Sequence, residues 1–61
     1  MIRYNRRVYY FQDEYNTFRD AYNKAKYMLS KRQARRYKIL AKTFDGARYF
    51  ELWLDRPTRL F

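Results

Sequence analysis

The chain has 61 residues and carries 15 lysines and arginines against 6 acidic residues, which gives a formal net charge of +9. A chain this short forms at most one small domain. It has no cysteine and no histidine, which excludes disulfide bonds, Cys/His zinc sites and the catalytic dyads and triads that need either side chain.

The composition also bears on location and on folding. The longest run of hydrophobic and aromatic residues is Val8–Phe11, whereas a membrane span needs about 20 apolar residues and a signal peptide about 7–15. The sequence therefore predicts neither, and the lack of cysteine favours the cytoplasm. Mean hydropathy is low, at −0.99, but 23% aromatic residues with one glycine and one proline are typical of a folded chain rather than a disordered one.

The first predicted element is a strand over about residues 2–12. The segment Arg7–Gln12 is rich in β-branched and aromatic side chains, which favour extended structure. A turn at Asn5-Arg6, which would divide the segment into a hairpin, is an alternative.

Hydrophobic residues then recur at spacings of three and four: Tyr15, Phe18, Tyr22, Ala25 and Leu29. This spacing predicts an amphipathic helix over about residues 14–35. Thr17 and Asp20 have the spacing of a capping box, and Asp13 is the rival N-cap, so the predicted start lies between residues 14 and 18. Basic residues at the predicted end suit the negative end of the helix dipole.

Asp45-Gly46 predicts a two-residue type I′ turn between strands at about 36–44 and 47–55, because both turn positions need positive φ. Such a turn sets Phe44 opposite Ala47 and fixes the register of every later pair. One face of this hairpin is then entirely hydrophobic: Tyr37, Ile39, Ala41, Phe50, Leu52 and Leu54. The other face is mixed, with basic, acidic and aromatic residues and one leucine: Arg36, Lys38, Leu40, Lys42, Tyr49, Glu51, Trp53 and Asp55.

These elements predict a single α+β domain over residues 1–61, of order β-α-β-β. One helix packs on one face of a three-stranded, mainly antiparallel sheet, and a tail covers residues 56–61. If the first strand pairs with the last, the sheet is wholly antiparallel; a parallel pairing with the second strand through a right-handed crossover is the alternative. In either arrangement the second face of the sheet is expected to stay open.

The positive charge is concentrated in one segment. Residues 21–44 carry 8 basic residues and no acid, and the densest part is the run Lys31–Arg36. Compensation of the helix dipole explains part of this run. Since the acid-free stretch extends from Asp20 to Asp45, the run also favours binding of phosphates.

A smaller basic group lies near the start of the sequence, where Arg3, Arg6 and Arg7 flank Tyr4. Basic arms of this kind can clamp a nucleic-acid backbone. The alternative is a frayed, solvated end.

Basic and aromatic side chains are interleaved on the open face of the predicted sheet. Lys38 lies opposite Trp53, and Lys42 lies opposite Tyr49. Lysines can meet phosphates while aromatic rings stack on bases, which is how several sheets bind single strands. The alternatives are cation–π pairs of an ordinary exposed sheet, a dimer interface, or cover by the tail. The predicted binding residues are those of this face and of the adjoining basic run: Lys31, Arg32, Arg35, Arg36, Lys38, Lys42, Tyr49 and Trp53.

Three acids that lie close in sequence, Asp13, Glu14 and Asp20, are the candidates for a metal or general-acid site. Helix capping accounts for two of them, and no second carboxylate pair is predicted to converge on them. A chain this small also has little room for a water-excluding pocket. We therefore expect no enzymatic activity, no metal and no cofactor.

The leading hypothesis is a small basic protein that binds nucleic acid, single-stranded or duplex, DNA or RNA, by charge and largely without sequence preference. The second is an interaction module, an inhibitor or adaptor that docks as a monomer or homodimer on an acidic surface of a larger protein.

The predicted strand, Thr-capped helix and Asp-Gly hairpin of this chain of 61 residues resemble the architecture of small phage-encoded proteins. Several of those proteins bind a host enzyme, and the resemblance implies no residue roles.

Overall fold

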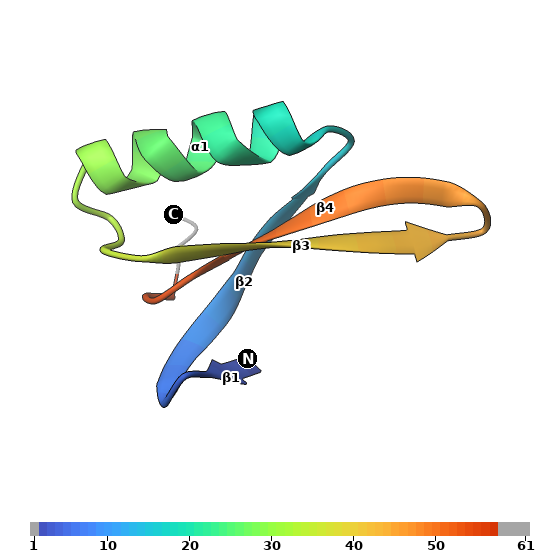
Figure 1. The fold of residues 1–61 in the computed structure, drawn as a ribbon. Helices are drawn as coiled ribbons and strands as arrows, with labels where there is room; N and C mark the ends of the chain where they lie inside the picture. Colours follow the sequence, from blue (N-terminus) through green and yellow to red (C-terminus); the bar gives the residue numbers. More distant parts are fainter. Residues whose placement is uncertain (1, 58–61) are drawn as a thin grey trace.

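The computed structural model describes residues 2–57 (Figure 1). Its elements, in chain order, are β1 (Ile2–Tyr4), β2 (Arg7–Tyr15), α1 (Phe18–Ser30), β3 (Tyr37–Phe44) and β4 (Ala47–Leu54). The predicted α+β class is confirmed, with one helix and a curled antiparallel sheet, but the sheet has four strands rather than three. Most of the predicted tail, residues 58–61, lies outside the described residues.

The additional strand comes from a tight turn at Asn5-Arg6. Both residues have positive φ, at 50° and 63°, and Tyr4 pairs with Arg7 across them, which defines a type I′ turn. The single strand predicted over residues 2–12 is therefore wrong, and the alternative hairpin is correct. An arginine in the left-handed region is sterically costly, which is why the dipeptide is a weaker turn signal than Asp45-Gly46.

The strands are arranged in the order β1-β2-β4-β3, and all neighbours are antiparallel. The antiparallel alternative is thus correct and the parallel crossover is wrong. The predicted hairpin register is confirmed at every pair from Tyr37↔Leu54 to Phe44↔Ala47. The hydrophobic face specifies this register, since a slip by one residue would turn charged side chains into the core.

Strand β2 continues to Tyr15, beyond the predicted strand end at residue 12, and α1 begins correspondingly later. Glu14 and Tyr15, predicted as helix, instead pair with Glu51 and Phe50 of β4, after a bulge between Phe11 and Asp13. Thr17 is the N-cap, and its Oγ1 accepts a hydrogen bond from the backbone N–H of Asp20 at 3.1 Å. The helix therefore begins at Phe18, at the end of the predicted range of starts.

The predicted helix end at residue 35 is also wrong, because α1 ends at Ser30. Arg32 has a φ of 60° and donates its backbone N–H to Leu29 O, and Gln33 donates its own to Met28 O. These two bonds form a Schellman motif, which normally has glycine at the left-handed position. The basic run Lys31–Arg36 is consequently a loop beyond the helix and not its last turn.

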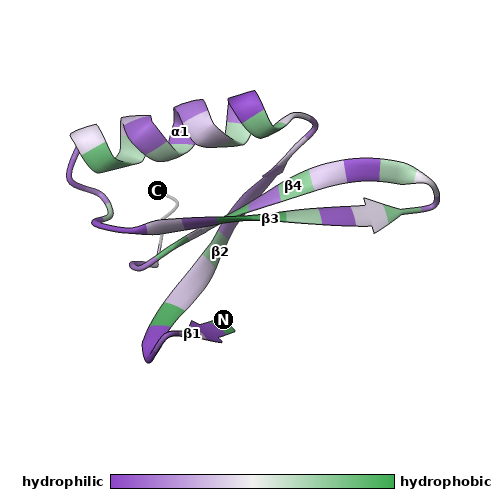
Figure 2. Ribbon diagram, viewed as in Figure 1, coloured by the Kyte–Doolittle hydropathy of each residue, from purple (hydrophilic) through white to green (hydrophobic). Residues whose placement is uncertain are grey.

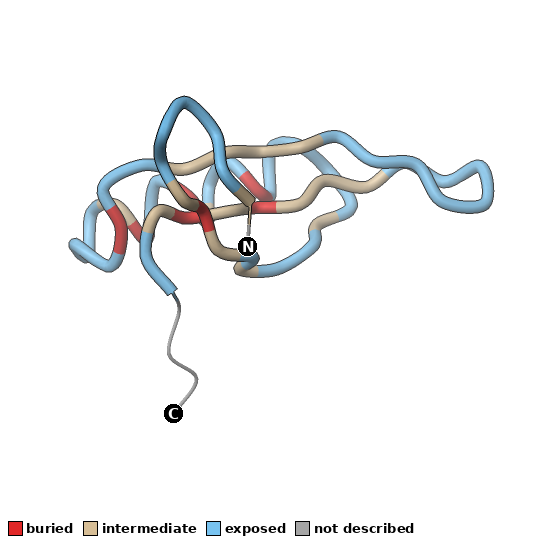
Figure 3. Tube along the Cα trace, turned by 90° about the horizontal axis from the view of Figure 1, so that it is seen from below, coloured by how far each residue is buried: buried red, intermediate tan, exposed pale blue. Residues whose placement is uncertain are grey.

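The core lies between α1 and the hydrophobic face of the sheet, where the buried cluster comprises Ala25, Met28, Ala34, Leu52 and Leu54. Buried positions lie where the elements cross, whereas the end of the β3–β4 hairpin projects into solvent (Figure 3). Hydrophilic and hydrophobic residues alternate along α1 and the strands (Figure 2). Tyr15 packs against this cluster, and burial, together with the nearby Asp13 carboxylate, raises the pKa of its phenol.

The second face of the sheet is only partly open, contrary to the prediction. Tyr9 lies two residues before Phe11 in β2, so the two side chains share one face of the sheet. Phe11 pairs with Trp53, which lies between the core residues Leu52 and Leu54 of β4, so this is the face opposite α1. Tyr9 is nevertheless only 5% exposed. The sheet curls so that β1 lies on the side away from the helix (Figure 1), and the β1–β2 end of the sheet thereby shields part of this face.

Among residues 2–57, no helix is both long and apolar enough to cross a lipid bilayer. The one helix described, α1, has 13 residues.

Candidate nucleic-acid interface

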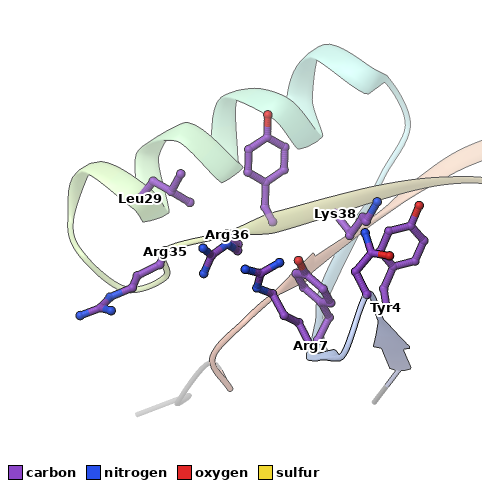
Figure 4. Close-up of a pocket in the computed structure, with 9 residues that line it drawn as sticks. Tyr4, Arg7, Leu29, Arg35, Arg36 and Lys38 are labelled. Atoms are coloured by element: carbon purple, nitrogen blue, oxygen red, sulfur yellow. The ribbon is translucent and has the colours of Figure 1, made fainter.

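Two adjoining pockets lie where the β1–β2 hairpin, the start of β3 and the end of α1 meet. The first pocket has a volume of about 350 Å³ and is lined by Tyr4, Asn5, Arg7, Tyr9, Leu29, Arg35, Arg36, Tyr37 and Lys38 (Figure 4). The second pocket has a volume of about 530 Å³ and is lined by Leu29, Arg32, Ala34, Arg35 and Arg56. Because Leu29 and Arg35 line both, we treat the two pockets as one feature and call it the basic groove.

The basic groove carries positive charge from four separate segments. Its cationic residues are Arg7, Arg32, Arg35, Arg36, Lys38 and Arg56. No aspartate or glutamate is among the described residues that line it. A concave surface lined by one sign of charge focuses its field into the groove and attracts anions. The arginines are all exposed, so their guanidinium groups are available to a ligand.

The loop that carries Arg35 and Arg36 is held in place by Asp55, at the end of β4. The backbone N–H of Arg35 donates to Asp55 Oδ1 at 2.9 Å, and the backbone N–H of Asp55 donates to Arg36 O at 3.1 Å. This reciprocal pair of bonds ties the loop to the end of β4, which is an inner strand of the sheet. One oxygen of the Asp55 carboxylate thereby accepts a backbone N–H of the loop.

The opposite wall of the first pocket depends on the Asn5-Arg6 turn. The turn sets Tyr4 opposite Arg7, so both side chains lie on one face of the hairpin. The guanidinium group of Arg7 points toward that of Arg36, whereas Arg35 extends away from them (Figure 4). The groove therefore presents two arginines from distant parts of the sequence to the same space.

Tyr4 and Lys38 join the two edges of the curled sheet. Lys38 Nζ lies 3.4 Å from the centroid of the Tyr4 ring, which is a close cation–π contact. Strands β1 and β3 are the two outer strands of the sheet, so this contact closes one side of the first pocket. Tyr4 remains 47% exposed, and part of its ring is accessible from solvent.

Half of the predicted binding residues meet in the basic groove. Arg35, Arg36 and Lys38 line the first pocket, and Arg32 lies beside Arg35 in the second. Lys31 does not line the groove; its Nζ lies 5.7 Å from the centroid of the Tyr27 ring.

The other predicted residues lie elsewhere on the sheet. Trp53 pairs with Lys38 in register, but its ring packs edge-to-face on Phe11 at 5.5 Å and its Nε1 donates to Glu51 Oε1 at 3.1 Å. Trp53 is consequently a packed, half-buried side chain rather than a free stacking platform.

Lys42 and Tyr49 pair with each other near the end of the β3–β4 hairpin. Tyr49 lines a separate pocket of about 300 Å³ with Glu14, Phe44 and Ala47. Lys42 belongs to the exposed end of the hairpin, residues 41 to 48, and Tyr49 follows this end directly. Neither residue lines the basic groove.

The list of predicted binding residues did not include Tyr4, Arg7 and Arg56, although the sequence analysis named the arm with Tyr4 and Arg7 as one that can clamp a nucleic-acid backbone. For Tyr4 and Arg7 the signal was the Asn5-Arg6 turn, which folds the basic arm back onto the sheet instead of leaving it frayed. Arg56 follows the last strand as a single cation, and nothing in the sequence pattern distinguishes it.

Within the described part of the chain, no group of three or more Asp and Glu side chains is placed to hold a metal ion. Comparison with protein families, with curated proteins and with solved structures finds no match.

Proposed function

We propose that the protein binds nucleic acid through the basic groove, mainly by charge and largely without sequence preference, in the cytoplasm. The observation that carries this proposal is the groove itself, in which six cationic side chains surround adjoining pockets that no described acid lines. Clustering like charges costs free energy in the unbound protein. A polyanionic ligand that neutralises them offsets this cost.

Arginine is the residue best suited to this role. Its planar guanidinium group can donate two parallel hydrogen bonds to a phosphate, and it stays charged at all physiological pH values. Five of the six groove cations are arginines. Contacts to phosphate set the position of a ligand but carry no sequence information, so the affinity is expected to be nearly independent of sequence.

The salt dependence of binding tests this proposal. We expect a fluorescently labelled oligonucleotide to bind at low salt, with an affinity that falls steeply as salt rises. If four groove cations meet phosphates of a single strand, the slope of log K against log salt concentration is about −3. Absence of binding at low salt, or an affinity that salt does not change, would contradict the proposal.

A second candidate function is docking on another protein, and one observation favours it. Phe44, at the end of the projecting β3–β4 hairpin, is 75% exposed, and β3 is an outer strand of the sheet. Exposed aromatic residues and free strand edges are common contact points for protein partners. A one-to-one protein complex that survives nuclease treatment and is lost on Phe44→Ser would support this function.

A further inference from the structure

We infer that the basic groove selects single-stranded nucleic acid, with one unpaired base stacked on Tyr4 in the first pocket and the neighbouring phosphates held by the arginines that follow along the groove. This inference rests on the proposed function and narrows its ligand to strands with accessible bases. It follows from which aromatic ring in the pocket is free, from how that ring is supported, and from where the cations lie around it.

Three tyrosines line the first pocket, but only Tyr4 is available to a ligand. Tyr9 is 5% exposed, so its ring is covered. Tyr37 is half-buried against the helix-side core, and its ring lies edge-to-face to that of Tyr22 at 6.3 Å. Tyr4 has neither restriction, since nearly half of its surface is exposed. A base that enters the pocket therefore meets Tyr4.

Lys38 supports the Tyr4 ring for stacking. The ammonium group lies over the ring at 3.4 Å from its centroid and so occupies one face of the ring. A planar base can then stack on the face that remains, with Tyr4 between the base and the cation. Base–aromatic stacking needs an exposed base face, whereas in a duplex those faces are covered by neighbouring base pairs.

Cations continue along the groove from this stacking position. Arg7 and Arg36 point into the first pocket, whereas Arg35 extends away from them (Figure 4) and also lines the second pocket, together with Arg32 and Arg56. A strand with its base on Tyr4 can thus place one phosphate near Arg36 and the next near Arg35. The first pocket, at about 350 Å³, lies at the small end of the range for ligand pockets, roughly 300–1,000 Å³, which suits one nucleotide rather than two paired strands.

The decisive variants are Tyr4→Leu and Tyr4→Phe, titrated against a labelled single strand of eight nucleotides and a hairpin duplex of equal charge. Tyr4→Leu keeps an apolar side chain but removes the π-face, and it should weaken single-strand binding about tenfold while duplex binding changes less than twofold. Tyr4→Phe keeps the ring and should bind as the wild type does. Equal losses for both ligands, or no loss for either, would overturn the inference and leave the proposed function standing.

A ligand-based measurement decides the question even if Tyr4→Leu disturbs the hairpin. A single strand of the same length made of abasic nucleotides should bind the unmodified protein about tenfold more weakly than the natural strand, because it offers phosphates without bases. Equal binding of the two strands, or full competition by polyglutamate of matched charge, would show that the groove is a general polyanion site. If no oligonucleotide binds at all, the proposed function itself fails.

Discussion

Replacement of Leu52 by alanine should leave most of the chain unfolded at room temperature. Leu52 is fully buried at the centre of β4, where it pairs with Ile39 of β3 and Asp13 of β2 and packs in the core under α1. Truncating a buried leucine costs about 2–5 kcal/mol. A core of this size supplies a free energy of unfolding of only about 3–5 kcal/mol, so the cost of this one substitution is as large as the whole free energy of unfolding.

The matched control for this prediction is Leu40→Ala. Leu40 lies on the opposite face of the sheet, is half-buried and pairs with Glu51, so the same chemical change should cost under about 1.5 kcal/mol, since less apolar area returns to water. Urea unfolding followed by circular dichroism measures both variants. If Leu52→Ala keeps the wild-type midpoint, or if Leu40→Ala costs as much, the core does not lie between α1 and this face of the sheet.

The combined substitution Arg7→Gln and Arg36→Gln should lower affinity for a single-stranded oligonucleotide about 100-fold at low salt. Both arginines line the first pocket, and the guanidinium group of Arg7 points toward that of Arg36 (Figure 4). Each charge-assisted hydrogen bond to a phosphate contributes roughly 1.5–3 kcal/mol, which is at least tenfold in affinity. The salt slope should also become shallower by about 1.4, since two phosphate contacts are lost.

The free energy of unfolding of this double variant should rise or stay unchanged. Because no described acid lines the pocket, neither arginine has a carboxylate partner there, and removing the two charges relieves repulsion. The control pairs Arg19→Gln with Arg48→Gln, which removes the same charge from exposed positions of α1 and β4 outside the groove. An equal loss of affinity in the control would show that only net charge matters, and not the groove.

Much of the fold follows from local patterns in the sequence. The Asp45-Gly46 turn and the alternation that follows it predict the β3–β4 register correctly at every pair. The spacing of hydrophobic residues predicts α1, and Thr17 predicts its N-cap. In these segments the local preference and the tertiary structure agree, because the same hydrophobic side chains define both the period and the core.

The errors occur where tertiary contacts override local preference. Tyr15 continues the hydrophobic period of α1, yet pairing with β4 holds both Glu14 and Tyr15 in β2. Arg6 and Arg32 adopt positive φ, which arginine rarely does, so residue type gave the first hairpin turn only as an alternative and did not reveal the end of α1.

For the candidate site, the composition identified the charge but not its arrangement. The acid-free segment contains Arg32, Arg35, Arg36 and Lys38, which line the groove. The curl of the sheet, which brings Tyr4 onto Lys38, depends on a contact between two outer strands and leaves no periodic signal. For the same reason the sequence could not show that Trp53 packs edge-to-face on Phe11.

The central claim is that the basic groove is the binding surface, and an amide chemical-shift map tests it most directly. The isotope-labelled protein would be titrated with a single-stranded oligonucleotide of eight nucleotides at low salt. We predict that the largest shifts fall on the segments 4–7 and 32–38 and on Arg56, with little change in 41–48. Shifts concentrated in 41–48, or spread evenly over all basic residues, would contradict the claim.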